Sequence, residues 1–206
     1  MRGYPWYNKL MPIPPLSELI LTLQNGTARE QYQAALLLSG YRERQAVEAL
    51  GLILNSSKDS ALQDIAIKSL GRMGPLAFDE LSRALGAGST PGHSRHVVRA
   101  HAAEALGKQD NPAAINPLLN ALKDPHPDVR KQAAGALIHY KEDRSIEELK
   151  QVLLNDPDAG VRNRAASVLQ AMGITAPVNI PTIITISKPV SKPLPPHRSD
   201  TSTKEN

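Results

Sequence analysis

Three histidines, His93, His96 and His101, come nearest in this sequence to the residue types and spacing of a metal site. Zn²⁺ is commonly held by imidazole nitrogens together with further histidine, cysteine or carboxylate ligands. His93 and His96 would share a face of one helix if that helix starts before His93, whereas His101, five residues beyond His96, turns away from it. Glu104 is the one carboxylate close by in the sequence, and it does not complete a ligand set. We therefore predict a solvated, basic helix start here and no metal site.

Other signatures of catalysis are missing from the sequence. It contains no phosphate-binding Gly-x-x-x-x-Gly-Lys-Ser/Thr, no Gly-x-Gly-x-x-Gly, no Gly-x-Ser-x-Gly and no His-Glu-x-x-His. The glycine-rich segment 86–92 lacks a following lysine, and Glu147 and Glu148 are adjacent, so on a helix they diverge by about 100°. We predict no catalytic residue, no cofactor-binding residue and no cofactor, and we favour a non-enzymatic protein over an enzyme.

Composition limits the class of protein further. The 206 residues allow one ordinary domain plus a tail, and the absence of cysteine excludes disulfides and thiolate chemistry. The formal net charge is only +4, and the basic residues alternate with acidic ones instead of forming a stripe. These basic residues are Arg95, Arg99, Arg130, Lys131, Arg162 and Arg164. Since nucleic-acid binding needs a concentrated basic face, nucleic acid is an unfavoured partner.

A long internal repeat determines which elements carry these residues. The pattern of residues 33–50 returns 99 positions later in residues 132–149, which indicates a unit of about 33 residues and hence a solenoid. Small residues recur four positions, and leucines eight positions, after the start of each copy, so both lie on one helical face. The recurring residues are Ala34, Ala66, Ala102, Ala133 and Ala165, then Leu38, Leu70, Leu106, Leu137 and Leu169.

A second amphipathic helix is expected after each of the first four helices. Apolar residues recur at i, i+3, i+4 and i+7 within residues 46–54, 78–85, 115–122 and 146–153. Breaks at Gly71–Pro75 and Gly107–Pro112 separate first from second helices, and aspartates such as Asp124 and Asp156 stand where they can cap the next helix. The pattern predicts four helix pairs and a fifth first helix. Arginines recur once per copy, and we expect them to pair with aspartates of the preceding turn.

A repeated motif, Asp-Pro-x-x-x-Val-Arg-x-x-Ala-Ala-x-x-Leu, stands at residues 124–137 and again at 156–169. A third copy keeps Val98-Arg99 and Ala102-Ala103 but lacks the Asp-Pro. The motif resembles the HEAT-like repeat of the phycobilisome-lyase type, over residues 16–172. The resemblance implies an all-α, right-handed α-solenoid of about four and a half HEAT-like helix pairs, with the second helices lining a concave surface.

The two ends of the chain differ from the repeats. Residues 1–15 contain Tyr4, Trp6 and Tyr7 and several prolines, and we expect an extended segment that folds against the first repeat as a cap or docks a partner. A helix should begin at Leu16. Residues 173–206 are rich in Pro, Ser and Thr and predict a disordered tail, in which the β-prone segment 180–186 could add to a partner's sheet.

The first functional hypothesis is a protein-protein interaction scaffold, or adaptor, that binds a protein partner on its concave face. The candidate residues are the polar ones between the apolar positions of the second helices: Glu48, Asp79, Asn116, Asn120, Glu147, Lys150 and Gln151. The alternative, implied by the resemblance, is a phycobilin lyase or pigment chaperone that acts on phycobiliproteins and handles a bilin. No apolar run is long enough to span a membrane and no signal peptide is evident, so we expect a cytoplasmic protein.

Overall fold

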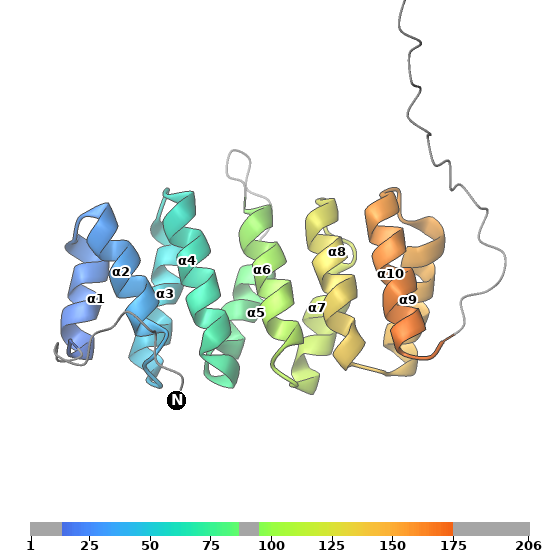
Figure 1. The fold of residues 1–206 in the computed structure, drawn as a ribbon, viewed down its shortest axis with the longest axis horizontal. Helices are drawn as coiled ribbons and strands as arrows, with labels where there is room; N and C mark the ends of the chain where they lie inside the picture. The colour runs from blue at the N-terminus through green and yellow to red at the C-terminus, as the bar shows by residue number, and fades with distance from the viewer. Residues whose placement is uncertain (1–13, 87–94, 175–206) are drawn as a thin grey trace, which may run out of the picture. The chain divides into compact units, whose positions relative to one another are not determined.

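The structure, a computed structural model, describes residues 14–86 and 95–174, in which every regular element is a helix (Figure 1). Its α-helices are α1 (Leu16–Asn25), α2 (Ala28–Leu38), α3 (Arg44–Ser56), α4 (Ser60–Arg72), α5 (Phe78–Gly86), α6 (His96–Gly107), α7 (Ile115–Ala121), α8 (Pro127–Ala136), α9 (Asp143–Asn155) and α10 (Ala159–Ala171). Short 3-10 helices at Gly74–Ala77 and Pro112–Ala114 lead into α5 and α7, and Leu137–His139 extends α8. The predicted all-α fold is confirmed.

Several helices begin at a capping side chain. The Asp59 carboxylate accepts hydrogen bonds from the backbone N–H groups of Ala61 and Leu62 at 2.8 and 3.2 Å, and so caps α4. Asp158 caps α10 in the same way by accepting from the Val161 N–H. At α8 the capping residue is His126, whose Nδ1 accepts from the Asp128 N–H at 3.3 Å. Capping by aspartate is therefore found at α4 and α10, but the two aspartates named from the sequence are not the caps. Asp158 caps α10 in place of Asp156, and His126 caps α8 in place of Asp124.

The helices are arranged in two layers (Figure 1). The even layer consists of α2, α4, α6, α8 and α10, and the odd layer consists of α1, α3, α5, α7 and α9. Each odd helix packs most closely on the even helix that follows it, so the described residues form five pairs, from α1–α2 to α9–α10. The sequence predicted four pairs and a half, because α1 precedes the first recognisable repeat. In the structure α1 completes that pair by packing on α2.

Small residues decide how closely neighbouring helices approach. Adjacent helices of the even layer contact each other extensively, whereas those of the odd layer contact each other sparsely. In the even layer Gly107 of α6 lies against Ala136 of α8: a Cβ added at Gly107 would lie 2.5 Å from the Ala136 Cβ. Gly71 of α4 likewise lies against Ala105 of α6. Both glycines belong to the last turns of their helices and are not in the breaks where the sequence placed them.

This difference in spacing corrects one prediction. A double-layered stack bends toward the layer whose helices are closer together, which here is the even layer. The second helices of the sequence analysis are α3, α5, α7 and α9, all in the odd layer. They therefore lie on the outer side of the bend, and the expectation that they line a concave surface is wrong. The small alanine and glycine residues of the first helices, which form the even layer, determine which side of the stack is the inner side of the bend. The polar residues of the second helices do not.

A buried ladder of arginine and aspartate connects successive repeats. Arg99 of α6 donates from Nε and Nη2 to the Asp124 carboxylate at 2.7 and 3.0 Å, and Arg130 of α8 binds Asp156 through the same atoms at 2.8 and 2.9 Å. Arg130 Nη1 also donates to the backbone oxygens of Asp124 and Pro125. The predicted arginine–aspartate pairs exist. However, each carboxylate belongs to the turn before the next even helix, and not to the turn that precedes the helix of its arginine. The preceding turn contributes carbonyl oxygens instead.

Burial and hydrogen bonding act in opposite directions on these groups. Burial of Asp156 works to raise the pKa of its carboxyl, but the Arg130 hydrogen bonds prevail and the pKa is lowered. Hydrogen bonding to Asp156 raises the pKa of the Arg130 guanidinium. Both side chains are almost fully buried, so each is the main charge partner of the other. Both shifts favour the ionised form of the Arg130–Asp156 pair.

The two predicted end segments lie almost wholly outside the described residues. The N-terminal aromatics, the disordered tail and the β-prone segment are not among them. At the C-terminal limit Ile174 packs against the core and its N–H donates to the Leu169 oxygen at 2.9 Å. In the described ranges, no helix is long and apolar enough to cross a membrane.

Candidate functional site

The predicted partner-binding residues all lie on the odd layer. Glu48 is on α3, Asp79 on α5, Asn116 and Asn120 on α7, and Glu147, Lys150 and Gln151 on α9. Their side chains are exposed, except that of Lys150, which is partly buried. They are thus free to meet a partner, and their role stays a prediction.

The structure brings these residues together only in small groups. On α9 the Glu147 carboxylate accepts from Gln151 Nε2 at 3.2 Å and lies 3.5 Å from Lys150 Nζ. Asn116 and Asn120 line one cavity of about 400 Å³ between α5 and α7, and Asn116 Oδ1 accepts from Arg144 at 2.9 Å. These polar groups satisfy each other within the chain.

The even layer carries two neighbouring cavities that form a more extended groove. One, of about 280 Å³, lies between α6, α8 and α10, and the other, also of about 280 Å³, lies between α4 and α6. Glu104 of α6 and Lys108, the residue after α6, line both cavities and so join them. We call the two together the even-layer groove. It crosses four successive even helices on the inner side of the bend.

Positive charge predominates in the even-layer groove. Among the described residues, four basic side chains and one carboxylate, that of Glu104, line it; the basic ones are Lys68, Arg72, Lys108 and Arg164. Lys68 also pairs with the neighbouring Asp64 carboxylate at 2.6 Å. Lys108 Nζ donates to Glu104 Oε1 at 2.6 Å, and this hydrogen bond lowers the pKa of the Glu104 carboxyl. The histidines His101 and His139 also line the groove. A ligand here meets a surface that favours anionic groups.

Arg164 is the most available of these cations. A Cβ added at Gly135 of α8 would lie 2.5 Å from Arg164 Nη2, so the guanidinium of α10 rests against the α8 backbone where a side chain is missing. Within residues 14–86 and 95–174, no carboxylate pairs with Arg164. Beside it, Ile138 lines the same cavity with 38% of its surface exposed. The site therefore offers a guanidinium fork next to an apolar contact.

Sequence reasoning missed this groove for a definable reason. It noted that basic residues alternate with acidic ones along the chain and concluded that they form no basic face. It did not separate the arginines of the buried ladder from the basic residues that face the groove. Of the six basic residues that it weighed, two belong to the buried ladder and only Arg164 lines the groove. The other groove cations, Lys68, Arg72 and Lys108, were not considered. The recurring glycines were the available signal, because a helix glycine without a capping role indicates close approach.

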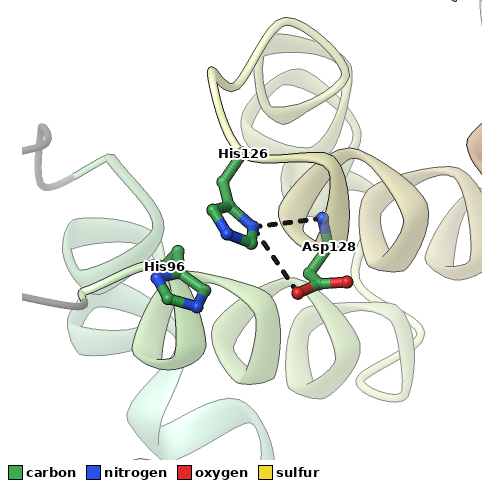
Figure 2. Close-up of side chains that lie close together, drawn as sticks. All are labelled: His96, His126 and Asp128. Atoms are coloured by element: carbon green, nitrogen blue, oxygen red, sulfur yellow. Dashed lines mark hydrogen bonds and ion pairs between the residues drawn. The ribbon is translucent and has the colours of Figure 1, made fainter. Parts of the chain in front are cut away.

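One group of side chains could hold a metal ion. His96, the first residue of α6, and His126 and Asp128, at the start of α8, each place one ligand atom within 4.8 Å of the others (Figure 2). The two imidazole rings are stacked, with centroids 3.7 Å apart and planes 15° from parallel. His101, by contrast, pairs with Asp64 at 2.9 Å. Of the three histidines in the sequence cluster, His93 lies outside the described residues.

Comparison with known proteins identifies the repeats. Residues 89–170 match the family described as HEAT repeats. The fold is similar to that of the complex of CpcE and CpcF of phycocyanin lyase from Nostoc sp. PCC7120, with 22% identity, a TM-score of 0.53, and coverage of 74% of this chain and 96% of that one. An engineered protein is also similar, with 23% identity, a TM-score of 0.49, and coverage of 76% and 78%. No curated protein matches the chain.

These comparisons confirm the predicted type of repeat. The HEAT match covers the three copies in which the motif is strongest, and the similarity to the lyase complex extends the likeness of fold to about three quarters of the chain. At 22% identity that similarity concerns the fold alone.

Proposed function

We propose that this protein, whose residues 89–170 match HEAT repeats, is a binding scaffold whose even-layer groove holds an acidic segment of a protein partner. The observation that carries the proposal is the groove itself, which crosses α4, α6, α8 and α10 and is lined by four basic side chains and one acidic one. A partner segment lying across several repeats would meet a cation at each step. The proposal moves the partner site from the odd layer to the opposite face.

Physical chemistry supports an acidic and partly apolar occupant. Arg164 can form paired hydrogen bonds with a carboxylate, because its guanidinium has no carboxylate partner among the described residues. Ile138 supplies an apolar contact next to it. Lys108 is already paired with Glu104, so it contributes less charge than Arg164. Arg164 is therefore the expected centre of binding energy.

A charge-reversal pull-down tests this function. The double variant Lys108→Glu, Arg164→Glu reverses the groove, and the matched double variant Lys150→Glu, Arg144→Glu reverses two basic residues of α9 on the odd layer. Both would be used as baits in an extract of the native organism, with quantitative mass spectrometry of the bound proteins. We expect an acidic partner to be lost from the groove variant and kept by the odd-layer variant. Loss from the odd-layer variant alone would return the site to the face predicted from the sequence.

The second candidate is the alternative from the sequence, a phycobilin lyase or pigment chaperone acting on phycobiliproteins. The likeness of fold to the phycocyanin lyase complex and the basic groove, which could pair with an acidic pigment, support it. In the described part of the groove no aromatic side chain offers a stacking surface. Addition of free bilin to the full chain separates the two candidates. A change in bilin absorbance that the groove variant abolishes favours the pigment function, and unchanged absorbance favours the scaffold.

A further inference from the structure

We propose that His96, His126 and Asp128 form a binding site for a transition-metal ion of the Zn²⁺ type, which links α6 to α8. The three residues come from two successive repeats, and their ligand atoms lie within 4.8 Å of one another. Figure 2 shows the His96 side chain at the start of α6 and the other two at the start of α8. The site is independent of the even-layer groove, whose lining includes none of the three.

The donor set fits borderline divalent ions. Two imidazole nitrogens and one carboxylate oxygen are ligands that Zn²⁺ accepts at about 2.0–2.2 Å, with a fourth position left for water. Ni²⁺ and Cu²⁺ bind the same kind of set, whereas Mg²⁺ and Ca²⁺ prefer oxygen ligands alone. The chain has no cysteine that could compete for the ion. The Asp128 carboxylate also offsets the positive ends of the two helices that begin here.

Binding requires a defined side-chain movement. Ligands of a tetrahedral ion lie roughly 3.3 Å apart, so no pair of the three atoms has to close by more than about 1.5 Å. His126 Nδ1 and Asp128 Oδ2 are already 3.6 Å apart. The ring nitrogens point within their ring planes, and two nearly parallel rings cannot both aim at one ion. His96 must therefore rotate about its side-chain bonds. The His126 imidazole must also give up the hydrogen bond that its Nδ1 accepts from the Asp128 N–H at 3.3 Å. His96 and His126 are only partly buried, and the Asp128 side chain is 65% exposed, so room exists for these rotations.

The consequence for the fold is a cross-link between neighbouring repeats. α6 and α8 are already in close contact, and Gly107 and Ala136 meet near the far ends of these helices. An ion at their first turns would fix the two helices at both ends. Since a ligand that binds only the folded chain stabilises it, Zn²⁺ should raise the melting temperature.

Titration calorimetry of the full chain with ZnCl₂ tests the site. The variants are His96→Gln and His126→Asn, the latter because asparagine keeps a good helix cap while the imidazole is lost. His101→Gln, on the same helix but paired with Asp64, is the matched control. We expect one Zn²⁺ per chain, affinity reduced roughly tenfold or more in each of the two variants, and unchanged affinity in the control.

Two outcomes would overturn the site. One is the absence of binding by the wild-type chain, and the other is wild-type affinity in both His96→Gln and His126→Asn. Co²⁺ provides a readout that does not depend on the folding of variants. Bound to the wild-type chain, it should shift the ring-proton resonances of two histidines and give a visible spectrum typical of nitrogen and oxygen ligands. Shifted resonances belonging to other histidines would place the ion elsewhere.

Discussion

The two helix layers of this protein have the same number of helices and the same period, yet they differ in packing and in surface. In the even layer glycine and alanine bring neighbouring helices into close contact, and arginine–aspartate pairs connect the repeats. In the odd layer the helices are further apart and carry exposed polar residues that mostly pair locally. The comparison shows that the layer with the smallest side chains determines the bend, and so the position of the groove.

The strongest way to break the even layer is to remove one partner of the buried ladder. Arg130→Ala leaves the Asp156 carboxylate buried without its guanidinium, and we expect the free energy of unfolding to fall by about 3 kcal/mol. Arg162 occupies the same position in the next repeat, but within residues 14–86 and 95–174 it donates only to the backbone oxygens of Asp156 and Pro157. Arg162→Ala should therefore cost about 1 kcal/mol. Urea unfolding measures both, and equal losses would contradict the ladder.

Close approach in the even layer can be tested with a single methyl group. A Cβ at position 107 would meet the Ala136 Cβ at 2.5 Å and its Cα at 2.8 Å, so Gly107→Ala should destabilise by about 2 kcal/mol. The odd layer supplies the control at Gly86, the last residue of α5, where an added Cβ has nothing within 4 Å. Gly86→Ala should be neutral or slightly stabilising. Thermal melting of both variants measures the two effects. An unchanged melting temperature in Gly107→Ala would show that α6 and α8 are not in close contact.

A smaller effect is expected from acid. Because the pKa of the Asp156 carboxyl is lowered in the folded chain, its ion pair contributes stability above the unfolded-state pKa of about 3.9. That contribution is lost as the pH falls below this value and through the folded-state pKa. We expect Asp156→Asn to be less stable than the wild type near neutral pH, with the difference narrowing toward pH 2. A constant difference would mean that Asp156 is not ionised in the fold.

The smallest effect is expected on the odd layer. Glu48 and Asp79 are exposed on α3 and α5, so Glu48→Ala and Asp79→Ala should change the free energy of unfolding by no more than about 0.5 kcal/mol. Under the present proposal they should also leave partner binding unchanged. A loss of binding at unchanged stability would support the face predicted from the sequence.

Periodicity predicted the helices well, because alanine four residues and leucine eight residues into each repeat give an unambiguous helical face. It could not predict how the helices pair, since the same period describes α2 with α3 and α1 with α2 equally well. The sequence also placed the arginine ladder but not its direction, because Asp124 and Asp156 precede one even helix and follow another. The approach of His126 and Asp128 to His96 is a contact across a whole repeat, and spacing within one helix cannot reveal it.

The central claim is that partners bind on the even layer, and photo-crosslinking tests it most directly. A photoreactive residue would be placed at Ile138 in the even-layer groove and, as the matched position, at Asn120 on the odd layer, and each chain irradiated in an extract of the native organism. We predict that a partner is captured at Ile138, that excess acidic peptide prevents the capture, and that Asn120 captures nothing. Capture at Asn120 alone would contradict the account.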